Sequence, residues 1–325
     1  MSALVTLSRA FDERFALASV DGEDGVLLDL LTGEFYRVDC AGVVACVALA
    51  EGAGVSGAAA AIVRKFAVTH AQAESDVRAL LSSLARPARR RRPKQPVIFR
   101  AAENGFAMFV GRRHALDVER ATGRVETRRS DPARLRLVAP HVLALQGHAV
   151  LHASAALLGR KIVAFMGPSG AGKTTIANML RSLGAPRVSR DLVVLADTQR
   201  AFRYGEASIA TWSRRSARVI HASPLEAALR GPAVTVGAIL IVERSSAQSA
   251  LRIDELGGAA AIAALLENAF VELPDPRVWR AALITCGALA ARGLVRRAQV
   301  PEGRAALRRA LSAWVDGGAR VTRRT

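Results

Sequence analysis

Nine consecutive residues in the middle of the chain, GPSGAGKTT at Gly167–Thr175, restrict its fold more than any other segment. They fit the pattern G-x-x-x-x-G-K-[ST], in which a lysine and a hydroxyl residue follow the second glycine. An apolar run at Lys161–Met166 precedes this loop, and a helical pattern at Thr174–Leu183 follows it. A strand, a glycine-rich loop and a helix in this order predict an α/β layer around a sheet.

The residue types in this loop indicate a phosphate ligand. Glycines allow backbone N–H groups to turn toward phosphate oxygens, and the start of the following helix adds partial positive charge. We expect Lys173 to neutralise the β- and γ-phosphates and the Thr174 hydroxyl to coordinate Mg²⁺. The predicted ligands are therefore ATP and Mg²⁺, and the alternative is a degenerate loop that binds nothing. The residues expected to bind the nucleotide are Gly167, Pro168, Ser169, Gly170, Ala171, Gly172, Lys173, Thr174 and Thr175.

Strand and helix patterns alternate on both sides of the loop, which favours an α/β architecture for this part of the chain. The further predicted strands are Val97–Val110, Ala115–Thr127, Ala149–Leu158, Leu192–Ala196 and Val236–Val242. The further predicted helices are Pro132–Leu145, Ala259–Phe270, Val278–Arg292 and Glu302–Val315.

The residues around the loop, LHASAALLGRKIVAFMGPSGAGKTT followed by VSRDLVVL, resemble the HPr serine kinase family. His152 lies fifteen residues before Gly167, and Asp191 lies seventeen residues after Thr174. The resemblance covers roughly residues 97–290 and is strong at 151–196. It implies an HPr-kinase-like P-loop kinase domain in which Asp191 is the general base on an acceptor serine and His152 is the active-site histidine. Asp191 is then also expected to contact the metal together with Thr174.

These implied roles make chemical sense. A serine hydroxyl is a poor nucleophile, so a nearby carboxylate can orient it and accept its proton during phosphoryl transfer. His152 is placed to hydrogen-bond the γ-phosphate or Asp191. The structural alternatives are a satisfied core histidine for His152 and a carboxylate that caps a turn or helix for Asp191.

The sequence departs from the family pattern at several points. The family usually has two adjacent acids, but the first of them is Arg190 here. Arg190 either removes a proton relay or metal contact, or places a cation beside the transferred phosphate. The downstream metal-binding glutamate has no clear counterpart, and Glu206 and Glu243 are the candidates. The C-terminal signature of phosphorolysis is not recognisable, which argues against the reverse reaction.

Residues 1–86 predict a separate, small α+β domain. Val26–Val38 alternates around Thr32-Gly33 and predicts a β-hairpin, and three short helices follow it. Ser56 is the expected N-cap of the second helix, and Thr69 with Gln72 forms a capping box for the third. A hairpin with three small helices is a winged-helix-type unit.

The stretch GVLLDLLTGEFYRVDCAGVVACVALAEG, with the two helices after it, resembles the small peptide-binding chaperone of pyrroloquinoline quinone biosynthesis, the PqqD type. The match covers about residues 15–86. The resemblance implies that this domain binds the leader of a ribosomally made precursor peptide by strand addition beside the hairpin and third helix. The alternative is a winged helix that binds DNA or packs on its neighbour.

A proline- and arginine-rich segment at 87–96 predicts a stiff linker between this domain and a kinase domain at 97–325. It serves as a spacer or as a docking site for an acidic peptide. The net charge of the chain is +18, but residues 1–86 contain 7 basic and 11 acidic residues, so we expect no nucleic-acid partner. The chain shows neither a membrane span nor a signal peptide, so we expect a cytoplasmic protein without a membrane partner, and homo-oligomerisation stays open.

Together these features predict an ATP-dependent kinase that phosphorylates a serine or threonine of a precursor peptide in natural-product maturation. Two alternatives stay open at this point. One is a kinase for the hydroxyl of a small molecule, and the other is a nucleotide-gated peptide chaperone without catalysis. A winged-helix regulator with an ATPase is disfavoured by the acidic N-terminal domain.

Overall fold

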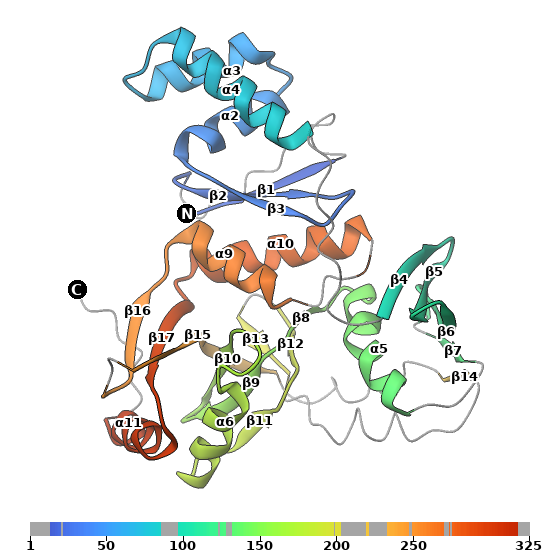
Figure 1. Ribbon diagram of the computed structural model, residues 1–325, viewed down its shortest axis with the longest axis vertical. Coiled ribbons are helices and arrows are strands. Elements are labelled where there is room, and N and C mark those ends of the chain that lie inside the picture. The colour runs from blue at the N-terminus through green and yellow to red at the C-terminus, as the bar shows by residue number, and fades with distance from the viewer. Residues whose placement is uncertain are drawn as a thin grey trace. The chain divides into compact units, whose positions relative to one another are not determined.

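The computed structural model describes residues 14–20, 22–85, 97–122, 124–127, 132–197, 199–202, 219–220, 233–246, 249–269, 273 and 275–317. The predicted linker at 87–96 lies outside the described residues. The chain divides into two compact units, each assembled from separate segments (Figure 1). Unit 1 consists of Met1–Gln95, Gly257–Leu266 and Pro274–Arg292, and unit 2 consists of Pro96–Leu256, Glu267–Leu273 and Gly293–Thr325.

Unit 1 contains the predicted hairpin and the three predicted helices, together with an additional N-terminal strand and two helices from the C-terminal part of the chain. Its strands are β1 (Phe15–Ser19), β2 (Gly25–Asp29) and β3 (Phe35–Val38). Its helices are α2 (Cys40–Ala50), α3 (Val55–Lys65), α4 (His70–Ala85), α9 (Gly258–Glu267) and α10 (Pro276–Ala291).

Local hydrogen bonds explain where the helices of unit 1 begin. Asp39 caps α2 by accepting a bond from the Gly42 backbone N–H at 2.8 Å. The Thr69 hydroxyl accepts the Gln72 N–H at 3.2 Å, as the predicted capping box requires. The prediction for Ser56 was wrong, because Gly54 is the N-cap of α3 and Ser56 lies within its first turn.

The antiparallel sheet β1-β2-β3 has one face against the neighbouring helices. Leu27 on β2 is fully buried there, in one cluster with Cys46 of α2 and Leu84 of α4. An ion pair supports the edge of this cluster, because Arg14 binds the buried Asp29 carboxylate at 3.1 Å and also donates to the Leu84 carbonyl. This face therefore has an apolar interior and one buried charge that is paired.

The other face of the same sheet is also buried, and α10 covers it (Figure 1). All residues of β1 and β2 are buried, so neither face is open to water. The register pairs Ala16 with Leu28 and Ala18 with Val26, which places these four side chains on one face. A Cβ on Gly287 of α10 would lie 3.3 Å from the Cβ of Ala18. Helix α10, from the C-terminal part of the chain, therefore covers the second face of a sheet formed by the N-terminal residues.

Alanine substitutions at Leu27 and Leu28 test this arrangement as a matched pair. The two adjacent leucines are both buried but face opposite sides of the sheet. We expect each substitution to lower the free energy of unfolding by about 2–5 kcal/mol, since each leaves a cavity in a closed core. Chemical denaturation of the full chain measures both changes. A loss below about 1 kcal/mol for Leu28→Ala alone would contradict coverage by α10.

Unit 2 is built around a nine-stranded sheet, in which seven strands have the order β11-β9-β10-β15-β13-β12-β8, and β17, paired with β15, and β16, paired with β17, are the other two. β15 is central, since it pairs in parallel with both β10 and β17. The strands are β8 (Ala149–Leu151), β9 (Ser154–Leu158), β10 (Lys161–Met166), β11 (Arg187–Ser189), β12 (Val193–Leu195), β13 (Arg200–Ala201), β15 (Val234–Ser245), β16 (Arg252–Glu255) and β17 (Val295–Pro301).

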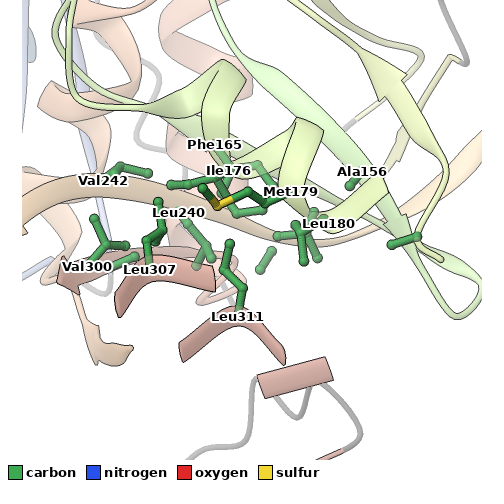
Figure 2. Close-up of a cluster of buried hydrophobic side chains, with 14 of the residues drawn as sticks. Ala156, Phe165, Ile176, Met179, Leu180, Leu240, Val242, Val300, Leu307 and Leu311 are labelled. Carbon is green, nitrogen blue, oxygen red and sulfur yellow. The ribbon is translucent and has the colours of Figure 1, made fainter. Parts of the chain in front are cut away.

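Two helices cover the parallel part of this sheet, α6 (Lys173–Ser182) and α11 (Arg304–Asp316). In Figure 2, Ile176 and Leu180 of α6 and Leu307 of α11 lie in one apolar cluster with Phe165 and Leu240 of the strands. Each of these side chains is at most 4% exposed. This cluster holds the start of α6 against the ends of β10 and β15, and so it positions the glycine-rich loop between β10 and α6.

A second, antiparallel sheet in unit 2 has the order β14-β7-β6-β5-β4. Helix α5 (Pro132–Leu145) packs on it, with the His141 ring 4.3 Å from the Phe99 ring between centroids. The strands are β4 (Val97–Ala102), β5 (Gly105–Val110), β6 (Arg113–Glu119), β7 (Val125–Thr127) and β14 (Val219–Ile220). The predicted strand Val97–Val110 is thus a hairpin of two strands.

Candidate functional site

The segment Gly167–Thr175, here called the glycine loop, connects β10 to α6. Gly167 and Gly172 have φ angles of 138° and 101°, in the left-handed region that glycine tolerates best. A Cβ at Gly167 would also lie 2.9 Å from the Val242 carbonyl oxygen of β15. Gly172 is the N-cap of α6. Because glycine has no side chain, it cannot accept a hydrogen bond from the N–H groups in the first turn of this helix. Such a helix start suits an anion.

Lys173 has its amine beside the first residues of the glycine loop. Its Nζ donates to the Gly167 carbonyl at 2.7 Å and to the Pro168 carbonyl at 3.2 Å. Partial burial lowers the pKa of Lys173, and the nearby Asp191 carboxylate acts in the opposite direction. The structure therefore brings the predicted phosphate-binding lysine and the predicted base within electrostatic range of each other.

Ser154, which the sequence analysis did not single out, links the loop to the segment that carries Asp191. It lies on β9 and is 1% exposed. Its hydroxyl is 3.3 Å from the Thr174 hydroxyl and donates a hydrogen bond to the Arg190 carbonyl. Ser154 thus positions the predicted metal-binding hydroxyl relative to the neighbour of Asp191. No motif in the sequence marks Ser154, because its place opposite Phe165, near the loop end of β10, follows from strand register.

Asp191 lies between β11 and β12, with its side chain exposed. The turn at this point is closed by Ser189, whose hydroxyl exchanges hydrogen bonds with the backbone of Leu192. Within the described residues Asp191 has no hydrogen bond that caps this turn, which disfavours the structural alternative for it. Its carboxylate instead faces Arg190, whose Nε is 3.6 Å from Asp191 Oδ2. Arg190 therefore pairs with the predicted base.

His152 follows directly after β8 and is exposed, which is contrary to the alternative of a core histidine. Its backbone N–H donates to the Asn268 carbonyl at 2.7 Å. β8 and β12 are antiparallel with Leu151 opposite Val193, so His152 lies one step further along, at the end that leads to Asp191. The sheet topology thus brings the backbones of the two predicted catalytic residues to the same end of β8 and β12.

Of the two candidates for a downstream metal ligand, the structure describes only Glu243. Glu206 lies outside the described residues. Glu243 on β15 is paired with Arg297, whose Nε is 3.3 Å from Glu243 Oε1. The described part of the chain contains no group of three or more His, Cys, Asp or Glu side chains that could hold a metal ion. Mg²⁺ bound with phosphates needs only one or two protein ligands, so Thr174 and Asp191 fit such an ion by their chemistry.

A second candidate site is the outer edge of β3 in unit 1. Within the described residues β3 pairs with β2 alone. The Asp29 N–H donates to the Glu34 carbonyl at 2.8 Å, and the register places Tyr36 opposite Leu27. In an antiparallel ladder, hydrogen-bonded pairs alternate with pairs that are not hydrogen-bonded. Since Asp29 and Glu34 are a hydrogen-bonded pair, the backbone N–H and C=O groups of Phe35 and Arg37 point away from β2. This edge has the geometry that an added strand requires.

Comparison with known proteins bears on unit 1. Residues 24–86 match the family model of PqqD, coenzyme PQQ synthesis protein D. The match spans β2, β3 and α2 to α4, and it confirms the predicted PqqD-like element. Such a domain implies a part in binding the precursor peptide of a natural product. In the comparison with curated proteins, none matches the chain.

None of the helices in the described part of the chain combines the length and the apolar character that a bilayer span requires.

Proposed function

We propose that this protein is an ATP-dependent kinase of the HPr-kinase-like type, which phosphorylates a serine or threonine of a ribosomally made precursor peptide. The observation that carries the proposal is the convergence of Lys173, Thr174 and Asp191 at a glycine loop. The PqqD-like domain in the same chain supports a peptide as the acceptor. HPr itself is a poorer acceptor, because a dedicated peptide-binding domain would then be superfluous.

In the proposed reaction each residue has one task. ATP supplies the phosphoryl group, and Mg²⁺ offsets part of the phosphate charge. Asp191 orients the acceptor hydroxyl and takes its proton while the new O–P bond forms and ADP leaves. Lys173 and the first-turn N–H groups of α6 hold the β- and γ-phosphates, and the Thr174 hydroxyl binds the metal. His152 hydrogen-bonds the γ-phosphate or Asp191.

Mass spectrometry tests the reaction directly. A candidate precursor encoded beside this gene is incubated with the full-length protein and ATP·Mg²⁺, and the peptide is examined for one added phosphate on serine or threonine. A leader-free core peptide serves as the control and is expected to react poorly at low concentration, because tethering through the leader raises the local concentration of the acceptor.

The leader is proposed to bind as a fourth strand on the outer edge of β3, so a proline at Arg37 is expected to weaken it. Proline removes an outward-facing N–H but leaves the inward ladder to β2 intact. We expect the dissociation constant of the labelled leader to rise about tenfold. This corresponds to the loss of one backbone hydrogen bond, which leaves a carbonyl of the leader without its donor. Fluorescence anisotropy measures this change.

Arg37→Ala is the matched control, since it removes the same exposed side chain and keeps the N–H. Equal leader affinity for Arg37→Pro and Arg37→Ala would rule out strand addition at this edge. Deletion of residues 1–86 is a poorer test. It removes β1, against which α10 packs, and so disturbs the C-terminal helices as well.

A second candidate function, a nucleotide-gated peptide chaperone, is favoured by one observation. The Arg190 guanidinium pairs with Asp191, so a cation occupies the carboxylate that the kinase reaction would need for the acceptor hydroxyl. In this alternative ATP changes the affinity for the leader and no phosphate is transferred. Leader affinity that depends on ATP, together with an unmodified precursor, would favour the chaperone over the kinase.

A further inference from the structure

Arg244 lies near the end of β15 and reaches the glycine loop from the neighbouring strand. Its Nε is 3.3 Å from the Ala171 carbonyl oxygen and donates a hydrogen bond to it. Its Nη2 lies 3.0 Å from the position that a Cβ would occupy on Gly172. The guanidinium therefore packs directly against the backbone from which α6 starts.

This position is electrostatically unfavourable for a cation in the absence of an anion. The start of a helix carries partial positive charge, and the Lys173 ammonium belongs to the same turn. Among the described residues, no carboxylate lies within ion-pair distance of Arg244. The adjacent Glu243 is paired with Arg297 instead. One hydrogen bond to a carbonyl does not require an arginine, whereas a bound polyphosphate would give this exposed guanidinium an anionic partner.

We propose that Arg244 is a second cation for the phosphates of the nucleotide, acting from β15 beside Lys173. This inference rests on the proposed nucleotide binding and adds a residue that the loop pattern does not contain. The guanidinium of Arg244 strengthens the binding of the polyphosphate and contributes nothing to recognition of the base.

Arg244→Gln tests the proposal, because glutamine keeps a donor for the Ala171 carbonyl but carries no charge. We expect the affinities for ATP and for inorganic tripolyphosphate both to fall about tenfold by titration calorimetry, since one charge-assisted contact is lost. The unfolding temperature without ligand is expected to stay the same or to rise. The matched control is Arg252→Gln, which removes an exposed arginine of β16 in the same sheet and should bind like wild type.

The results distinguish a failure of the role of Arg244 from a failure of nucleotide binding. Unchanged affinity for both ligands in Arg244→Gln would overturn the role of Arg244 and leave nucleotide binding standing. A lower unfolding temperature without ligand would also overturn it, because Arg244 would then be a structural latch on the Ala171 carbonyl. If wild type binds neither ATP nor tripolyphosphate, the proposed function fails and this inference fails with it.

Discussion

Lys173→Ala is expected to weaken ATP·Mg²⁺ binding by about 30- to 100-fold and to bring phosphoryl transfer below detection. The Gly167 and Pro168 carbonyls hold the Lys173 amine beside the loop, where the proposed phosphates bind. Removing it loses a charge-assisted interaction of the strong kind. Arg244 on β15 flanks the loop and cannot replace an amine that lies at its first residues. Titration calorimetry and a phosphoryl-transfer assay measure the two losses.

Lys161→Ala provides the control for this experiment. Lys161 is an exposed lysine at the other end of β10, so its substitution changes the net charge equally and leaves the loop intact. Its ATP affinity should match that of wild type. Equal ATP affinity and equal turnover in Lys173→Ala would refute nucleotide binding by the glycine loop.

Asp191→Asn is expected to lower turnover by about 10²–10⁴-fold while ATP affinity changes only a few-fold. Asparagine has the size of aspartate but cannot accept the proton of the acceptor hydroxyl, which is the task proposed for this residue. The side chain is exposed and carries no hydrogen bond of the turn within the described residues, so the fold should tolerate the change. Turnover at saturating ATP, with nucleotide affinity measured separately, distinguishes catalysis from binding.

Two companion variants sharpen this prediction. Asp197→Asn is the control, because Asp197 closes a turn by accepting the Gln199 and Arg200 N–H groups, and asparagine can still accept them. Arg190→Asp removes the cation that pairs with Asp191 and restores two adjacent acids. A rise in turnover would show that the ion pair restrains the base, and a fall would assign Arg190 to the phosphates. Full activity in Asp191→Asn would mean that another residue is the base.

The sequence by itself determined the parts of this protein that depend on near neighbours in the chain. The pattern of Lys161–Met166, the glycine loop and the helix after it depends on local periodicity, on positive φ and on capping, and the structure has that order. Helix α5 was predicted with its observed bounds. The hairpin of β2 and β3 and the capping box at Thr69 are equally local. Residue types within a few positions of one another carry enough information for such features.

Features that depend on contacts between distant segments were decided only by the tertiary structure. β17 pairs in parallel with β15. It was not predicted as a strand, because the adjacent Arg296 and Arg297 interrupt its hydrophobic pattern. The short apolar strand β1 is buried on both sides only because α10, more than 250 residues away in the chain, covers its second face. Ser154 and Arg244 reach the glycine loop from neighbouring strands, and their roles follow from strand order and register. No local pattern encodes which strand lies beside which, because that choice depends on how the whole core packs.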